Sequence, residues 1–233
     1  MVRFRVFKAT DDEASCHKFI EGHRRVLEIF GITMITSAKH EWVHHENTYV
    51  IIVESLEDGR ALGGARIQIA DEHLPLPIED AIGKIDLNIF KQLEIRKLLK
   101  TGELCGLWNS KEIAGFGVGS IFLIRAAVAL AYNLNLHSLF ALCAPATVRG
   151  GKKTGFEINS ELGNNGQFYY PKLDLIATAV IVANLRTLEK AEPIIKDLVF
   201  DLINNPDQLR KETSPKGDIE IKYELSVPNQ NSL

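Results

Sequence analysis

The sequence is poor in cysteine, with only three in 233 residues: Cys16, Cys105 and Cys143. They lie far apart and show no paired spacing, whereas a disulfide framework has an even number of cysteines at regular spacings. Residues 1–13 also lack the continuous apolar stretch of a secretory signal. We therefore expect a protein of a reducing compartment, the cytoplasm.

Long apolar runs and an excess of charge of one sign are absent too. The run at 121–132 is interrupted by Arg125 and is shorter than the roughly 20 residues of a membrane-spanning helix. Lys and Arg total 27 against 30 for Asp and Glu, which gives a net charge of −3. Proteins whose main task is to bind nucleic acid carry a basic excess instead. We expect neither a membrane nor a nucleic acid as a partner.

Hydrophobic residues make up 45% of the chain and charged residues 24%, the composition of a globular protein with a packed core. Alternating apolar and polar residues predict a first strand at 2–8 and a late strand at 218–227. Two β-branched runs, 48–55 and 61–70, flank a turn and predict an antiparallel hairpin. The late strand is expected to join the main sheet or to pair with its copy in a homodimer.

Helical patterns connect these strands. The expected helices run from residues 10–13 (TDDE), which supply an N-cap and first-turn acids, to about residue 30, from 78 to 100, from 118 to 134, and from 187 to 204. The chain shows no repeat and no linker between two domains. The sequence predicts a mixed α/β architecture in one domain, residues 1–227, followed by a polar tail, 228–233.

The segment 111–120 (KEIAGFGVGS) is rich in glycine and stands between an expected strand at 103–108 and the helix at 118–134. Because the next strand, 138–143, follows that helix, the two strands are expected to run parallel, joined by a right-handed crossover. Free N–H groups and the positive end of a helix dipole favour a phosphate at such a loop. Glycines that only ease a tight turn would give the same pattern.

Two common phosphate-binding motifs fail here. A dinucleotide fingerprint needs a third glycine near Phe122 and an acidic residue at the end of the next strand, which instead ends in Leu142 and Cys143. A P-loop needs Ser or Thr after Gly-Lys, where Lys153 stands. The loop therefore indicates neither of these nucleotide-binding folds.

The glycine loop resembles the signature loop of the Gcn5-related N-acyltransferase family, Gln/Arg-x-x-Gly-x-Gly/Ala. Its glycines match at 114–119 (AGFGVG), with Ala114 where the family prefers Arg or Gln. The order of elements is similar over roughly residues 3–183, including the closing Gly155-Phe156 pair. The resemblance implies the acyl-CoA N-acyltransferase fold, a mixed, mostly antiparallel sheet splayed between its fourth and fifth strands and flanked by helices.

Within this family the upstream half is similar to the acyl-homoserine lactone synthases and the N-acyl amino acid synthases. The runs 24–26 (RRV) and 63–67 (GGARI) resemble their early arginine and their Gly-x-x-Arg strand. The run 103–106 (ELCG) resembles their Glu-x-x-Arg strand, with Gly106 in place of the arginine. The resemblance implies an autoinducer-synthase-like acyltransferase.

The implied reaction is direct attack of a small amine on the carbonyl of an acyl thioester, with no covalent enzyme intermediate. The co-substrate is acyl-CoA or an acylated acyl carrier protein, and no metal takes part. Glu103 is our candidate for the base that accepts the ammonium proton, directly or through water. A solvated acid at the end of a strand would look the same. The usual tyrosine acid is missing at Gly151 and Lys152, so Tyr169, Tyr170 or water would act instead.

Binding residues follow from the same resemblance. Arg24, Arg25 and Trp42 are expected to line the acceptor site. Arg66 is expected either to bind an acceptor carboxylate or to pair with an acid on a neighbouring strand. The track for the pantetheine arm and its phosphates is expected at these residues: Leu107, Trp108, Asn109, Gly115, Phe116, Gly117, Val118, Gly119 and Ser120.

Two other functions stay open. The residues His40-Glu41-Trp42-Val43-His44 spell H-E-x-x-H, which on an α-helix would place two imidazoles on one face for zinc, with Glu41 as the base of a peptidase. A polar loop near a substrate site would explain these residues equally. The second alternative is a protein that binds acyl thioesters without catalysis, as the missing Tyr and Arg positions suggest.

Overall fold

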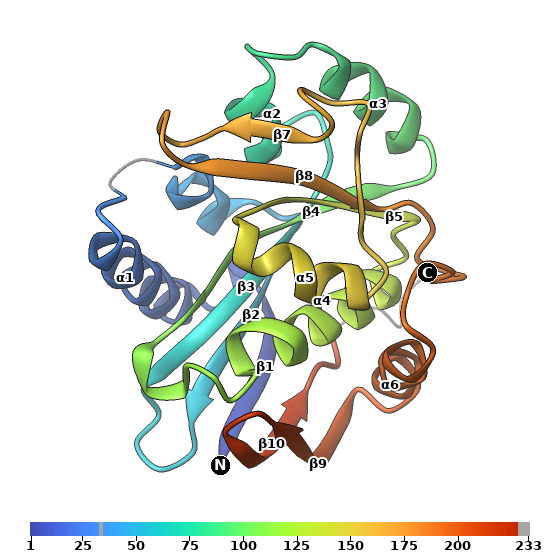
Figure 1. Cartoon of the computed structure of the whole chain (residues 1–233). Helices are drawn as coiled ribbons and strands as arrows, with labels where there is room; N and C mark the ends of the chain where they lie inside the picture. Colours follow the sequence, from blue (N-terminus) through green and yellow to red (C-terminus); the bar gives the residue numbers. More distant parts are fainter. Residues whose placement is uncertain (33–34, 228–233) are drawn as a thin grey trace.

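The computed structural model describes residues 1–32 and 35–227, so the expected polar tail, 228–233, lies outside the described residues. The described strands form one sheet in the order β6-β8-β5-β4-β3-β2-β1-β10-β9, and β7 pairs with β8 (Figure 1). Among the described strands, only β1–β10 and β4–β5 are parallel pairs. The strands are β1 (Val2–Lys8), β2 (Thr48–Ser55), β3 (Ala61–Ile69), β4 (Thr101–Asn109), β5 (Ser138–Cys143), β6 (Glu157–Ile158), β7 (Gln167–Tyr169), β8 (Ile176–Val182), β9 (Asp207–Ser214) and β10 (Gly217–Glu224).

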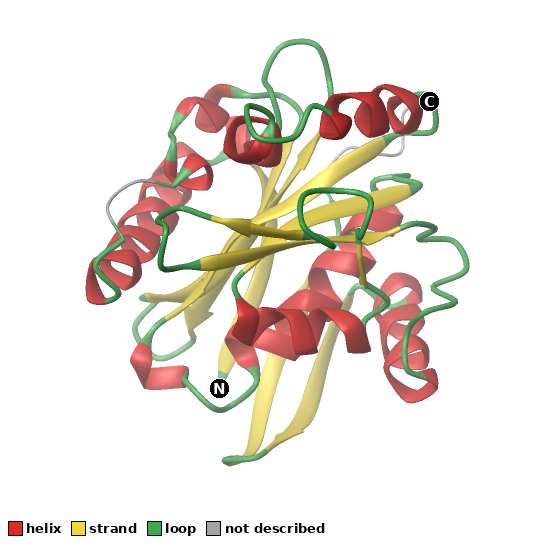
Figure 2. Ribbon diagram, turned by 45° about the horizontal axis from the view of Figure 1, so that its top comes forward, coloured by secondary structure: helices red, strands yellow, loops and turns green. Residues whose placement is uncertain are grey.

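Helices cover both faces of this sheet (Figure 2), which confirms the expected fold class. On one face, Phe19 of α1 packs with Val50 and Trp108, and on the other, Leu130 of α4 shares a core with Ile51. None of the described helices is long and apolar enough to cross a lipid bilayer. The helices are α1 (Glu13–Ile29), α2 (Pro77–Ile82), α3 (Asn88–Lys97), α4 (Leu123–Asn133), α5 (Pro145–Lys153) and α6 (Pro193–Asn204).

Local sequence signals account for the N-terminal elements. The Asp12 carboxylate accepts a hydrogen bond from the Ser15 N–H at 3.0 Å, and so caps the start of α1. The expected helix to about residue 30 and the expected β2–β3 hairpin are both confirmed.

The helix expected at 78–100 is wrong, because the chain forms two helices there. Asp86 Oδ1 accepts a hydrogen bond from the Asn88 N–H at 2.9 Å at the start of α3. A Cβ atom at Gly83 would lie 2.4 Å from the Phe90 ring. The break between the two helices therefore lets the Phe90 ring of α3 pack closely against the end of α2.

Two further helices begin later than expected. The helix expected from 187 begins at Pro193, because proline fits the first turn, has no N–H to donate and restricts the residue before it. The α-helix expected from 118 begins at Leu123, after one wide turn over Val118–Phe122 in which Ser120 has non-helical angles.

The late strand joins the main sheet, as expected. β10 pairs with β9 along its whole length and with β1 at residues 221–224, so both of its edges are occupied only over that half. Pairing of this strand across a homodimer stays a prediction for residues 217–220. The sequence did not predict β9, which forms the outer edge.

Candidate functional site

The strands β4 and β5 separate after a short paired stretch, as expected for this fold. They pair only from Thr101–Ser138 to Glu103–Phe140. Beyond that point the described residues of β4 pair with β3 alone, through a bulge in which Gly106 has φ of +60°. This backbone conformation favours glycine and accounts for its presence where the resembled synthases carry arginine. The result is a fork, with one edge of residues 104–109 unpaired.

The glycine loop follows β4 directly, at the open end of this fork. Gly117 has φ of +75° and precedes the wide turn that leads into α4. Within this turn the Ser120 and Phe122 N–H groups donate to the Gly117 carbonyl, so the first N–H groups, which have no acceptor within the turn, belong to Val118 and Gly119. Ser120 is exposed beside them, and its hydroxyl donates to the Gly117 carbonyl at 3.3 Å. The arrangement places N–H donors at the positive end of α4, where an anion is favoured.

Close packing also requires the glycines of this loop. A Cβ atom at Gly119 would lie 2.1 Å from Asn109 Oδ1, and one at Gly117 would lie 2.8 Å from the Phe122 ring. A bulky side chain at either position would distort the loop whether or not it binds phosphate. Ser120 is the cleaner position for a test.

Two residues of the expected pantetheine track have side chains in the core. The Trp108 ring packs 6.0 Å from the Phe19 ring of α1, and Val118 is fully buried. These two residues offer only backbone groups to the fork. Leu107, Asn109 and Phe116 are half-buried.

Glu103 lies at the apex of the fork, where β4 and β5 last pair. Its side chain is 2% exposed, so a solvated strand-end acid is excluded. Oε2 accepts a hydrogen bond at 2.7 Å from the Ile78 N–H in the first turn of α2, and no donor among the described residues bonds Oε1. Burial raises the pKa of Glu103 to about 8, although the Ile78 hydrogen bond and the Arg66 charge act in the opposite direction.

Arg66 of β3 pairs with Cys105 of β4, two residues along from the Gln68–Glu103 pair, and is 1% exposed. Its Nη1 donates to the Ser37 carbonyl at 3.0 Å, and its guanidinium carbon lies 4.7 Å from the centre of the Trp42 ring. Within the described residues it forms no ion pair, so the expected pairing with an acid on a neighbouring strand is not observed.

A cavity of about 290 Å³ lies between α1 and the turns at 36–44. Trp42 and Arg24 line it, and the exposed Arg24 pairs with Glu28 along the helix. Arg25 is not among the described lining residues and pairs with Glu21 on the exposed side of α1. The structure thus brings Arg24 and Trp42 together but separates Arg25 from them.

His23 also lines this cavity, and the sequence analysis did not single it out. Burial, and secondarily Arg66, lower the pKa of His23 to about 4, so the imidazole is neutral at physiological pH. Its spacing of four residues from the buried Phe19 places it on the inner face of α1, and that periodicity is the signal that could have found it.

The H-E-x-x-H residues do not form a zinc-binding helix. Glu41–His44 is a 3-10 helix, in which residues four apart do not share a face, and both His40 and His44 are exposed. The described residues contain no group of three or more His, Cys, Asp or Glu side chains placed to hold a metal. The geometry gives the peptidase no support.

The other candidate groups are differently placed. Burial raises the pKa values of Cys105 and Cys143 to about 12, which makes these thiols poor nucleophiles. The Tyr170 hydroxyl accepts a hydrogen bond from the Thr36 N–H at 2.6 Å, whereas Tyr169 is exposed.

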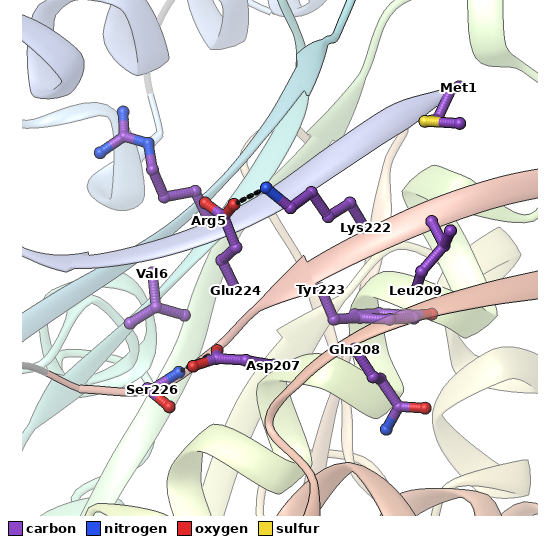
Figure 3. A pocket seen from close by; sticks show the side chains of 10 residues that line it. All are labelled: Met1, Arg5, Val6, Asp207, Gln208, Leu209, Lys222, Tyr223, Glu224 and Ser226. Atoms are coloured by element: carbon purple, nitrogen blue, oxygen red, sulfur yellow. Dashed lines mark hydrogen bonds and ion pairs between the residues drawn. The ribbon is translucent and has the colours of Figure 1, made fainter.

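A second hollow, an open groove of about 680 Å³, lies along β1, β9 and β10 (Figure 3). Within it, Lys222 pairs with Glu224 at 2.6 Å, and the Ser226 N–H donates to Asp207 at 3.1 Å.

No protein-family model and no curated protein matches this sequence. Solved structures do match. FeeM, an N-acyl amino acid synthase from uncultured soil microbes, has a TM-score of 0.59 at 13% identity, over 82% of this chain and 99% of its own. The CoA-dependent acyl-homoserine lactone synthase BjaI, solved with SAM and isopentyl-CoA, has a TM-score of 0.52 at 11% identity, over 88% and 90%. A mosquito arylalkylamine N-acetyltransferase-like protein reaches 0.51 at 14%, over 78% and 99%. The chain therefore has the Gcn5-related N-acyltransferase fold and resembles, in structure, the acyl-homoserine lactone and N-acyl amino acid synthases.

Proposed function

We propose that the protein is an N-acyltransferase that moves an acyl group from a thioester of CoA or of an acyl carrier protein to a small amine. The observation that carries this proposal is the fork between β4 and β5, which opens onto the glycine loop at the start of α4. The pantetheine arm, common to both donors, lies along the unpaired edge at 104–109. The phosphate groups lie at the amides of Val118 and Gly119.

The acceptor amine occupies the cavity beside α1, between Arg24 at its rim and Trp42 in its wall. Arg66 contacts Trp42 and lies close to Glu103, so the cavity and the apex of the fork adjoin on one face of the sheet. A pKa of about 8 leaves only a minority of Glu103 ionised at neutral pH, and this fraction accepts the ammonium proton directly or through water. The free amine then attacks the thioester carbonyl, and the departing thiolate takes the proton that the new amide nitrogen loses, so the donor leaves as the free thiol. Release of thiol from a panel of acyl-CoAs and amines tests for an enzyme, and binding without release would indicate a non-catalytic protein.

Ser120→Glu is expected to weaken CoA binding about tenfold, because it adds a negative charge at the amides proposed to hold the phosphates. Ser120→Gln, which has the same size without the charge, is the matched control and should bind CoA nearly as the wild type does. Isothermal titration calorimetry measures both. Equal affinities of the two variants would place the phosphates elsewhere.

Arg24→Ala is expected to raise KM for the amine about three- to tenfold, with little change in kcat, because Arg24 lines the cavity and exposed charges contribute modestly. Arg25→Ala, one residue away on the outer side of α1, should leave KM unchanged. Steady-state kinetics with an amine that the wild type acylates measure the difference. The same KM change in both variants would argue against this cavity as the acceptor site.

A further inference from the structure

The tip of the β9–β10 hairpin reaches the glycine loop. In the tight turn between these strands, the Ser214 hydroxyl accepts a hydrogen bond from the Lys216 N–H at 3.2 Å and donates to the Gly217 carbonyl at 2.8 Å. The Lys216 ammonium donates to the Ala114 carbonyl at 2.6 Å. A Cβ atom at Gly115 would lie 2.6 Å from Lys216 Cε, so the lysine side chain lies directly over this glycine.

Buried contacts fix the hairpin relative to the loop. Arg125, in the helix α4 that begins at the loop, forms a buried ion pair with Glu212 of β9. The Tyr223 hydroxyl of β10 donates to the same carboxylate at 3.0 Å. Because the glycine loop leads into α4 and α4 holds the hairpin along its side, the tip of the hairpin is held near the loop, where the exposed Lys216 side chain contacts it.

Among the described residues Lys216 forms no ion pair, whereas Lys211 of the same hairpin pairs with Asp218 at 2.8 Å. A lysine ammonium has three N–H donors, and the Ala114 carbonyl accepts one of them. Lys216 therefore adds an uncompensated positive charge beside backbone N–H groups that already favour an anion.

We propose that Lys216 binds a phosphate group of the nucleotide part of CoA, so that the β9–β10 hairpin forms one wall of the donor site. This inference rests on the proposed function. The β9–β10 hairpin would then help the protein to distinguish CoA, which carries a nucleotide, from the pantetheine arm alone.

The test compares Lys216→Met with Lys211→Met. Methionine keeps an unbranched apolar chain over Gly115 but removes the charge, and Lys211 is a matched lysine on the same hairpin. Dissociation constants of CoA, dephospho-CoA and pantetheine are measured by calorimetry and ligand-detected NMR, at low and at raised ionic strength. Urea unfolding of both variants shows whether the hairpin stays in place.

We expect Lys216→Met to bind CoA about five- to tenfold more weakly than the wild type and to bind pantetheine equally well. The difference in CoA affinity between the two proteins should shrink at raised ionic strength. Lys211→Met should bind CoA normally. If Lys216→Met weakens the binding of dephospho-CoA as much as that of CoA, Lys216 contacts the pyrophosphate. If the affinity for dephospho-CoA is unchanged, Lys216 contacts the 3′-phosphate, which dephospho-CoA lacks.

Unchanged CoA affinity of Lys216→Met, or equal losses for CoA and pantetheine, would overturn the inference while the wild type still binds CoA. A wild-type protein that does not bind CoA would overturn both this inference and the CoA form of the proposed function.

Discussion

Replacing Glu103 with glutamine should lower turnover by about 10²-fold or more while thioester affinity stays nearly unchanged. Glutamine retains a carbonyl oxygen that accepts the Ile78 N–H, so α2 keeps its hydrogen bond, but the side chain loses the capacity to take up a proton. The loss should shrink as the pH approaches the pKa of the amine, because the free amine then needs no base. Stopped-assay rates over a pH series measure both effects. Turnover of the variant equal to that of the wild type at neutral pH would mean that another group is the base. His23 would be the next residue to test.

The same substitution should change the pH dependence of folding. The Glu103 carboxyl has a pKa of about 8 in the folded protein against 4.5 as an unperturbed group. Between these values the folded state binds the extra proton, so the free energy of unfolding contributed by this residue falls as pH rises. Urea unfolding at pH 5 and pH 8 should therefore show Glu103→Gln gaining stability relative to the wild type at the higher pH. A constant difference would contradict the burial of an ionisable group here.

Replacing Arg125 with leucine should reduce the free energy of unfolding by about 3 kcal/mol or more, because it leaves the buried Glu212 carboxylate without its cation. Tyr223 still donates to that carboxylate, and Arg210, at 3.9 Å, compensates only in part. Urea denaturation measures the loss.

The double variant Arg125→Leu/Glu212→Leu is the control, since a buried ion pair replaced by apolar residues is often neutral in stability. We expect the double variant to be more stable than Arg125→Leu alone. Equal stability of the two would mean that the remaining Glu212 charge reaches water and that the pair does not hold the hairpin to α4.

The elements with strong local signals were predictable. The β2–β3 hairpin consists of two apolar runs joined by the five residues 56–60, and Asp12 marks the start of α1, so short-range chemistry determines both. The edge strand β9 was not predictable, because its sequence (DQLRKETS) is polar at seven of eight positions and exposed at every second one, as an edge strand protected from aggregation should be. Its pairing depends on β10 rather than on its own pattern.

The candidate site was also predictable only in part. The glycines at 115–119 can be recognised in the sequence because they form a local motif. Glu103 is recognisable by its place on a strand, but its hydrogen bond to Ile78 and its burial depend on where α2 docks. Lys216 carries no motif at all, since a lysine in a turn is normally solvated, and only the packing of the hairpin against α4 brings it to the loop.

The parallel pairing of β1 with β10 has a consequence for how the chain folds. During translation β1 can pair with β2 soon after both emerge, but its other edge must wait until nearly the whole described chain has been made. Contacts of such long sequence separation slow folding and leave an open edge exposed to other nascent chains. We therefore expect the β1–β10 pair to form last in the sheet. Lys216 then reaches the glycine loop only after the rest of the described chain has folded.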